Sequence, residues 1–389
     1  MSEVIISDAV KYVGCDDKTI DLFESQYKVP CGISYNSYVI LDDKIAVMDT
    51  VDARFTDEWL ANMEKVLKGR TPDYLVVQHM EPDHAGSIGA VCAKYPQMTI
   101  VASAKAFPMM DAFFEGKLAN PREEKKEMDT LCLGSHTLTF VMAPMVHWPE
   151  VMVSYESTEK ILFAADGFGT FGTLDQQEDD WSCEARRYFI NIVGKYGASV
   201  QALLKKAAGL DIAAICPLHG PVLKENLGYY IGKYDTWSSY RPEDKGVIIA
   251  CGSIHGHTKK AALEFAGMLK ARGEKEVSFF DLSRDDMAEA VEDAYRYDRM
   301  VIFAPTYDGA LFPCVHDFIY HLQIKNFQNR RVALVENGSW APVAAKKMKE
   351  MLSTCKDITF IEPAVTIKSA LSAASRAALE QLADAVVKA

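Results

Sequence analysis

Residues 76–88, VVQHMEPDHAGSI, hold the densest group of potential metal ligands in the chain. His79, Glu81, Asp83 and His84 all fall within this stretch, directly after an apolar run. In an extended segment alternate side chains share a face, so the first three can point to one side while His84 turns in as the strand ends. Burying two imidazoles with two carboxylates is costly unless a cation compensates the charge. The pattern therefore predicts a metal site.

Three further candidate ligands follow apolar runs later in the chain. They are His147 in APMVHWPE, Asp166 in LFAADGFG and His219 in CPLHGP, and each precedes a nearby Gly or Pro. This context is typical of a side chain delivered at the mouth of a sheet, although a single histidine there is more often just hydrogen-bonded. Seven ligands are too many for one metal and suit two, with a carboxylate such as Asp166 as the bridge. Nitrogen and oxygen ligands with several carboxylates favour iron or manganese over zinc.

The stretch SIHGHTKKAA, residues 253–262, predicts a phosphate site of a different kind. Ser253, Gly256 and Thr258 lie in a turn between an apolar run and a helical pattern. Backbone N–H groups at such a helix N-terminus can cradle a phosphate. Because the stretch fits neither GxGxxG nor GxxxxGK[ST], flavin mononucleotide (FMN) is favoured over a dinucleotide or a nucleoside triphosphate.

Two more loops, PTYDGALFP (305–313) and ENGSWAP (336–342), follow later strand-like runs. Ligands of open α/β sheets lie beyond the carboxyl ends of the strands, so these loops can hold the two edges of a flavin ring. Tyr307 or Trp340 can stack on the ring, the alternative being that such aromatic residues only fill their loops. The predicted FMN contacts are Ser253, Ile254, His255, Gly256, His257, Thr258, Pro305, Thr306, Tyr307, Asp308, Gly309, Asn337, Gly338, Ser339 and Trp340.

The elements that position these residues divide the chain in two. After the polar stretch YRPEDKG (240–246), strand-like runs alternate with helix-length segments, which predicts a doubly wound, five-stranded parallel sheet. Before it, short strand patterns interleave with helical ones, which predicts an α/β sandwich with mixed sheets. We expect domains at 1–243 and 246–389. The five runs expected as strands are 247–251, 276–282, 299–305, 331–336 and 358–365.

Composition narrows the class of protein. A chain of 389 residues exceeds the size at which one core keeps growing, which agrees with two domains. The formal net charge of −12 disfavours nucleic acid and anionic lipid as partners. No apolar run has the length of a membrane span, and no two of the nine cysteines form a CxxC pair. The N-terminal sequence lacks a basic region before a long apolar segment, so we expect a cytoplasmic protein.

The ligand motif HxExDH, followed by a His, an Asp and a His, resembles the metallo-β-lactamase fold, an αββα sandwich with a two-metal site at its edge. That family's hydrolases carry HxHxDH and usually zinc, whereas this chain has Glu81 at the second position. The C-terminal part resembles flavodoxin, although Asp308-Gly309-Ala310 stands where relatives often carry Asn-Asn-Gly. The two together resemble the flavodiiron proteins, also called A-type flavoproteins, over essentially the whole chain.

This resemblance implies an oxidoreductase that passes electrons from FMN to a non-haem di-iron centre and reduces O2 to water or NO to N2O. It implies His79, Glu81 and His147 on one iron and Asp83, His84 and His219 on the other, with Asp166 bridging. It also implies a head-to-tail homodimer. Because the chain lacks paired CxxC motifs, we expect no fused rubredoxin and a separate donor such as a rubredoxin or a flavoreductase, with direct reduction by a deazaflavin as the alternative. Two alternatives remain open: a zinc-dependent hydrolase with a flavodoxin-like appendage, and a flavin electron carrier whose first domain is only a scaffold.

Overall fold

The computed structural model describes residues 4–176 and 180–389, and its contacts divide the chain into two compact units. The first unit contains residues 1–189 and 198–235, and the second contains 190–197 and 236–389. The second unit thus begins a few residues before the expected boundary and includes one short segment of the preceding region. The domain limits 1–243 and 246–389 stay a prediction about which parts fold independently.

The first sheet of the first unit has the strand order β1-β6-β7-β8-β9-β10. Its first three strands pair antiparallel and the strands from β7 to β10 pair parallel, so the sheet is mixed as expected. The strands are β1 (Val10–Tyr12), β6 (Tyr38–Ile40), β7 (Ala46–Met48), β8 (Tyr74–Val77), β9 (Thr99–Ser103) and β10 (Arg122–Lys125). Two short pairs accompany the sheet: β2 (Cys15–Asp17) with β5 (Ile33–Tyr35), and β3 (Leu22–Phe23) with β4 (Tyr27–Lys28).

The second sheet has the order β11-β12-β13-β14-β15, antiparallel except for its last pair. The strands are β11 (Thr130–Cys132), β12 (Thr137–Met142), β13 (Met152–Glu156), β14 (Ile161–Phe163) and β15 (Ala214–Cys216). Alternate residues of both sheets form one buried apolar cluster, among them Met48 and Val76 from the first sheet and Phe140 and Phe163 from the second. The two sheets therefore pack face to face around the core of this unit.

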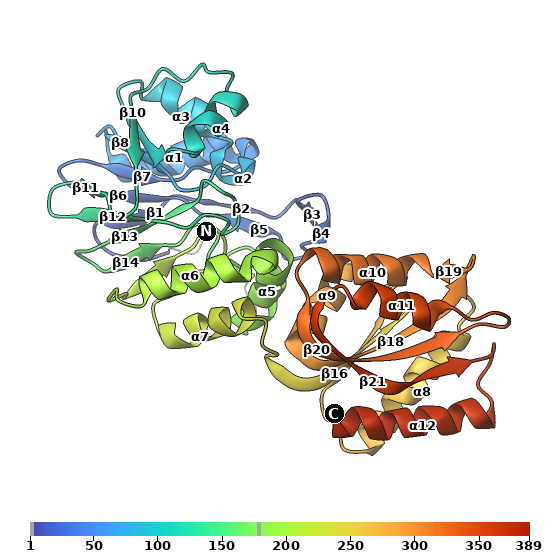
Figure 1. Cartoon of the computed structure of the whole chain (residues 1–389). Coiled ribbons are helices and arrows are strands. Elements are labelled where there is room, and N and C mark those ends of the chain that lie inside the picture. Colours follow the sequence, from blue (N-terminus) through green and yellow to red (C-terminus); the bar gives the residue numbers. More distant parts are fainter. Residues whose placement is uncertain (1–3, 177–179) are drawn as a thin grey trace. The chain divides into compact units, whose positions relative to one another are not determined.

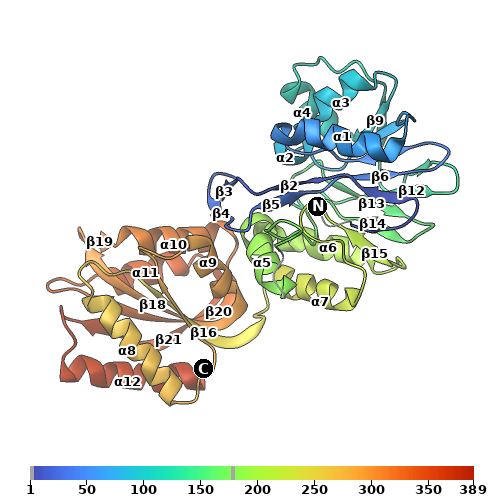
Figure 2. The same cartoon turned by 180° about the vertical axis from the view of Figure 1, so that it is seen from behind.

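Helices cover the outer faces of both sheets, which completes an αββα sandwich. Figures 1 and 2 show α1, α3 and α4 beside the first sheet and α6 and α7 beside the second. The helical segments of this unit are η1 (Ala53–Phe55), α1 (Thr56–Leu67), α2 (Pro82–Ala85), α3 (Ile88–Lys94), α4 (Ala106–Phe113), α5 (Trp181–Tyr188), α6 (Gly197–Ala207) and α7 (Leu227–Ser238). The short segments η2 (Phe189–Val193) and η3 (Gly194–Tyr196) fall almost wholly in the stretch 190–197 that belongs to the second unit. The metallo-β-lactamase-like architecture expected from the sequence is confirmed.

The second unit is a parallel sheet with the order β17-β16-β18-β20-β21. Its strands are β16 (Asp244–Cys251), β17 (Val277–Asp281), β18 (Tyr297–Tyr307), β20 (Gln328–Asn337) and β21 (Lys356–Ile367), and the short β19 (Ala310–Leu311) pairs with β18. All five strands expected from the sequence are present. This order is the flavodoxin-like one, in which the direction of the strand-to-strand connections across the sheet reverses between β16 and β18 while all the strands stay parallel.

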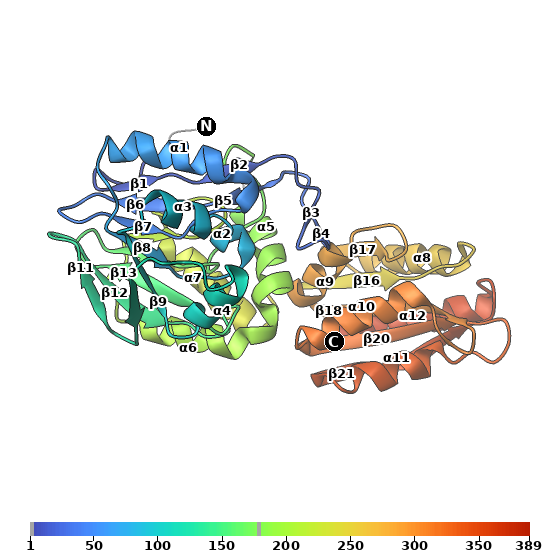
Figure 3. The ribbon, with the colours of Figure 1, turned by 90° about the horizontal axis from the view of Figure 1, so that it is seen from above.

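Helices lie on both faces of this parallel sheet (Figure 3). They are α8 (His257–Ala271), α9 (Met287–Arg296), α10 (Pro313–Ile324), α11 (Ala344–Leu352) and α12 (Ala373–Lys388). Phe265 of α8 and Leu379 of α12 are fully buried against Val301 and Val335 of the central strands. No helix among the described residues is both long enough and apolar enough to cross a membrane.

Candidate metal centre and ligand pocket

The HxExDH motif does not continue the strand that leads into it. Strand β8 ends at Val77, and helix α2 begins at Pro82, so Asp83 and His84 are helical. The expectation that Asp83 shares a strand face with His79 and Glu81 is wrong. Proline at the first position of a helix has its φ angle preset for helix formation, and this ends the extended backbone after Glu81.

Four of the predicted ligands converge in a first cluster: His79, Glu81, His147 and Asp166. The Nε2 atoms of His79 and His147 lie 3.2 and 3.0 Å from Oε2 of Glu81. The same two nitrogens lie 3.1 and 3.2 Å from Oδ2 of Asp166. Two imidazole nitrogens and two carboxylate oxygens therefore face a common point.

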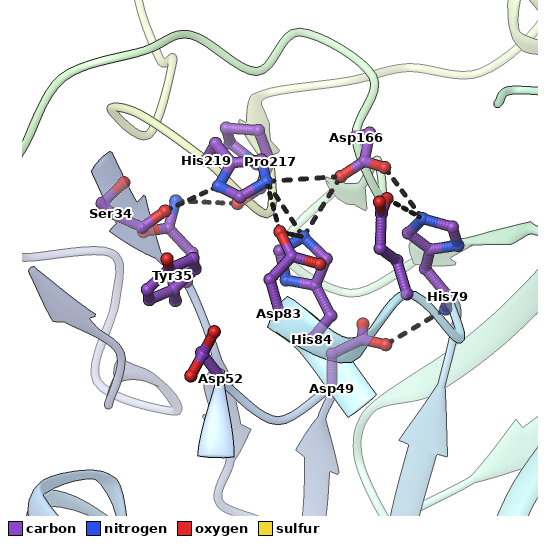
Figure 4. A network of polar contacts seen from close by, with 12 residues as sticks. Ser34, Tyr35, Asp49, Asp52, His79, Asp83, His84, Asp166, Pro217 and His219 are labelled. Carbon is purple, nitrogen blue, oxygen red and sulfur yellow. Dashed lines mark hydrogen bonds and ion pairs between the residues drawn. The ribbon is translucent and has the colours of Figure 1, made fainter. Parts of the chain in front are cut away.

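The other three predicted ligands, Asp83, His84 and His219, form a second cluster beside the first. Oδ2 of Asp83 lies 3.3 Å from Nε2 of both histidines, and these two nitrogens are 3.0 Å apart. Oδ1 of Asp166 lies 3.3 Å from Nε2 of His84 and 3.8 Å from Nε2 of His219. One oxygen of Asp166 thus faces each cluster, which is the geometry of a bridging carboxylate (Figure 4).

The surroundings of the clusters fit two bound cations. His79, His84, His219 and Asp166 are almost wholly buried. Among the described residues, the carboxylate oxygens of Asp83 and Asp166 make no hydrogen bond of good geometry, and their near neighbours are the imidazole nitrogens of the other ligands. Buried carboxylate oxygens without donors cost free energy unless a positive charge replaces the lost water. Mixed imidazole and carboxylate ligands suit iron or manganese.

Hydrogen bonds on the far side of two rings aim their Nε2 atoms at the clusters. Nδ1 of His79 lies 2.9 Å from Oε1 of Glu150, and Nδ1 of His219 lies 2.7 Å from the carbonyl oxygen of Ser34. Each acceptor requires the proton on Nδ1, so Nε2 of each ring presents a lone pair inward. Glu150 also accepts from the backbone N–H of Met80, which fixes the loop after β8.

The sequence reasoning did not identify Glu150, although a carboxylate in the stretch HWPE beside a candidate ligand was a usable signal. It also passed over Asp49, which is buried where β7 ends. Asp49 accepts hydrogen bonds from the backbone N–H groups of Gln78 and His79, at 2.7 and 3.3 Å. These bonds tie the loop that carries the motif to the neighbouring strand.

The carboxylates give this site a field that favours positive charge. Burial disfavours a charged His147, but Asp166 and Glu81 outweigh it and raise the pKa of that imidazole to about 9. Burial likewise opposes ionisation of Asp166, yet His79 and its neighbours hold the pKa of this carboxyl well below its ordinary value. The same field that favours a proton on His147 favours a metal cation in its place.

The second unit has a pocket of about 540 Å³ at the carboxyl ends of its strands. It is lined by the three loops that the sequence singled out. Of the predicted FMN contacts, Ile254, His255, His257, Thr258, Pro305, Thr306, Asp308, Gly309, Asn337, Gly338, Ser339 and Trp340 line it. Ser253, Gly256 and Tyr307 lie in the same loops but do not line it. Ala341 and Ser369 also line it and were missed, although Ser369 follows β21, whose end belongs to the same sheet edge.

Several of the loop residues hold the loops themselves. The hydroxyl of Ser253 accepts hydrogen bonds from the backbone N–H groups of Gly256 and Lys259, at 3.1 and 3.2 Å. Gly256 has a φ of +86°, which glycine adopts without strain, and it forms the turn into α8. The hydroxyl of Thr306 accepts from the backbone N–H of Val343, at 2.9 Å, at the start of α11. These hydrogen bonds fix the backbone that surrounds the pocket.

Two aromatic side chains at this pocket are unusually exposed. Trp340 is 83% exposed and Tyr307 is 42% exposed. Tyr307 has one ring neighbour, Phe312, whose centroid lies 5.6 Å away in an edge-to-face arrangement. Trp340, which lines the pocket, is free to stack on a planar ligand, whereas Tyr307 lies in an adjoining loop without lining it.

Comparisons with known proteins agree with this architecture. Residues 33–220 match the family model described as ODP family beta lactamase. A nitric oxide reductase of Moorella thermoacetica is 29% identical over 374 residues, which cover 94% of this chain and 93% of that protein. An anaerobic nitric oxide reductase flavorubredoxin of Escherichia coli is 26% identical and matches over 90% of this chain and 75% of its own length.

Solved structures give the same result. The rubredoxin oxygen:oxidoreductase of Desulfovibrio gigas superposes with a TM-score of 0.92 and 26% identity, covering 99% of this chain and 97% of that one. The flavodiiron protein of Giardia intestinalis superposes with a TM-score of 0.90 and covers 100% and 96% of the two chains. At 24% sequence identity, this second similarity shows the fold alone.

Proposed function

We propose that this chain, which matches the flavodiiron proteins in sequence and fold over nearly its whole length, is a flavodiiron reductase. It passes electrons from FMN to a non-haem di-iron centre and reduces O2 to water, NO to N2O, or both. The observation that carries the proposal is the pair of ligand clusters joined by Asp166, in one chain with a phosphate-loop pocket. When bound, two neighbouring irons would supply electrons in quick succession to a small gas molecule.

In this proposal His79, Glu81 and His147 hold one iron, and Asp83, His84 and His219 hold the other. Asp166 bridges them through its two oxygens, which face different clusters. Glu150 and the Ser34 carbonyl orient His79 and His219 by holding their Nδ1 protons. Glu81 in place of a histidine hardens the donor set, which favours iron over the zinc of a hydrolase.

The pocket of the second unit holds FMN, with its phosphate at the start of α8 and its ring between the loops that carry Tyr307 and Trp340. Backbone N–H groups at the helix N-terminus favour the phosphate charge. The Ser253 hydroxyl accepts from an N–H of its own loop, and the Thr306 hydroxyl accepts from the N–H of Val343 at the start of α11, so both fix the backbone around the cofactor site. The two rings are exposed enough to contact the isoalloxazine directly.

We further propose a head-to-tail homodimer in which the FMN of one chain faces the metal centre of its partner. The high exposure of Trp340 at the FMN pocket supports this arrangement, because a partner surface would remove a large aromatic ring from water. A separate redox protein, such as a rubredoxin or a flavoreductase, delivers the electrons. The cytoplasmic location stays a prediction from the sequence.

The test begins with purified protein in which iron, zinc and FMN are measured. The protein is reduced without air and mixed rapidly with O2 or with NO, while flavin reoxidation and the product are followed. We expect two irons per FMN, fast reoxidation by at least one gas, and water or N2O as the product. The His79→Ala variant should retain FMN and lose the fast reaction.

Three results would refute the proposal. Zinc in the clusters together with esterase or lactamase activity would identify a hydrolase. Slow reoxidation by O2 with hydrogen peroxide as the product, and none by NO, would mean that the flavin works alone. Unchanged electron transfer and gas reduction in His79→Ala would mean that the first unit serves only as a scaffold.

A further inference from the structure

A cavity of about 450 Å³ lies within the first unit, between the outer face of the second sheet and helices α6 and α7. Its walls are almost entirely aliphatic, with contributions from Leu203 and Ala207 of α6 and from Ile231 of α7. Ala208 and Asp211, which also line it, are exposed, so the cavity reaches the surface beyond the end of α6. It shares no lining residue with the FMN pocket.

Strand alternation explains why this face of the sheet is apolar. Met152, Phe163 and Cys216 point into the core between the two sheets. Their neighbours Val153, Leu162 and Ile215 point the other way and line the cavity. Both faces of these strands are therefore buried and apolar, but the helices on the outer side leave space that the side chains do not fill.

Two residues that line the cavity are next in the chain to predicted metal ligands. Val146 lines the cavity and directly precedes His147, and Gly167 lines it and directly follows Asp166. Phe168 also lines the cavity, and its ring stacks on that of Tyr234, another lining residue, with centroids 4.2 Å apart. The loops that present the first cluster are thus also walls of the cavity.

We propose that this cavity is a binding site and entry route for the neutral diatomic gas that the metal centre reduces. This inference rests on the proposed function. Cavities lined by aliphatic side chains stay dry, and one of about 150 Å³ takes up benzene or xenon. O2 and NO are small and carry no net charge, so they enter apolar space without the desolvation penalty that polar solutes incur. A charged or strongly polar reductant is excluded from the same path.

The first arm of the test uses xenon, which occupies apolar gas sites without any chemistry. Crystals of the whole protein are pressurised with xenon, and the anomalous signal is mapped. We expect xenon among the side chains of Val153, Leu162 and Ile215. The variants Ala207→Phe and Val153→Phe, which place a ring in the space, should lose that signal.

The second arm measures the rate at which the reduced protein reacts with O2 and with NO as the gas concentration is varied. Ala207→Phe and Val153→Phe should lower the second-order rate constant several-fold, with unchanged iron and FMN content and an unchanged rate at saturating gas. Ala202→Phe is the matched control, because Ala202 is exposed on the same helix and does not line the cavity. It should react like the wild type.

An active wild-type protein that takes up no xenon in this cavity refutes the inference and leaves the proposed function intact. The inference also fails if both cavity variants exclude xenon and still react at the wild-type rate. Failure of the wild type to reduce either gas would refute the proposed function, and this inference with it. The inference is supported if the wild type binds xenon in the cavity, the two cavity variants lose the xenon and react more slowly with the gas, and Ala202→Phe behaves like the wild type.

Discussion

Replacing Glu150 tests whether the contact behind His79 matters for metal binding. Glu150 is buried, and its Oε1 accepts from Nδ1 of His79 and from the backbone N–H of Met80, each at 2.9 Å. Glu150→Ala removes the one oxygen that accepts from both donors. The His79 ring is then free to turn, and the Met80 N–H is left buried without a partner.

The size of the effect follows from these two contacts. Loss of a group that orients a metal-bound histidine typically lowers metal affinity about 10- to 100-fold, which corresponds to about 1.4–2.7 kcal/mol. The orphaned N–H adds about 1–3 kcal/mol of lost folding stability. Glu150→Gln keeps a carbonyl oxygen for both donors and loses only the charge, so it should show a smaller loss of affinity.

The assay is a competition between the protein and a coloured chelator for Fe²⁺ without air, with bound FMN as an internal control. Glu156→Ala is the matched variant, because Glu156 is also a buried glutamate but accepts from the backbone N–H groups of Thr158 and Glu159. It should lower stability and leave iron affinity unchanged. Equal iron affinity in Glu150→Ala and in the wild type would refute the reasoning.

Three further predictions concern other parts of the molecule. Burial opposes protonation of His136, but its contact with Asp42 raises the pKa, so this pair stabilises the fold below the ordinary imidazole pKa and loses that effect as pH rises through the folded value. The loss of unfolding free energy in His136→Gln should therefore be larger at about pH 5.5 than at about pH 8.5 in urea titrations. Gly220, beside a predicted ligand, has a φ of +79°, and an added Cβ would lie 2.6 Å from Cγ2 of Thr170. Gly220→Ala should lower stability by about 1–2 kcal/mol or more, measured by urea unfolding. Ser253→Ala should weaken FMN binding, followed by flavin fluorescence, because two N–H groups of the phosphate loop lose their acceptor.

Each of these predictions has an opposing outcome. If the difference in unfolding free energy between His136→Gln and the wild type does not change with pH, the charge on His136 contributes nothing to its contact with Asp42. Wild-type stability in Gly220→Ala would show that Thr170 and the backbone move aside at little cost. Unchanged FMN affinity in Ser253→Ala would mean that the loop keeps its conformation without the hydroxyl.

The fold was largely predictable because its signals are local. Strand-sized apolar runs separated by helix-length segments and Gly or Pro appear in the printed sequence, and they correspond to β16, β17, β18, β20 and β21. The prediction failed where a single residue changed the local conformation. Pro82 starts a helix inside the ligand motif, so Asp83 reaches the site from a helix and not from a strand.

The flavin pocket was predictable for a similar reason. The carboxyl ends of parallel strands meet at one edge of the sheet, so the loops after β16, β18 and β20 had to lie together. Applying that rule to the loop after β21 would also have identified Ser369. The spacing of residues in the sequence did not show which side chains line the pocket and which only hold a loop. Ser253 holds its loop through hydrogen bonds that only the structure reveals.

The sequence alone determined the seven candidate ligand positions and the two layered architectures, because residue chemistry and short-range periodicity are carried by neighbouring residues. Only the tertiary structure decided how the ligands group, which oxygen of Asp166 faces which cluster, and that Glu150 orients His79. These features join residues far apart in the chain: 71 positions separate His79 from Glu150, and 135 separate His84 from His219. The apolar cavity behind the ligand loops is likewise a product of packing between a sheet and two helices, and no local pattern in the sequence specifies empty space.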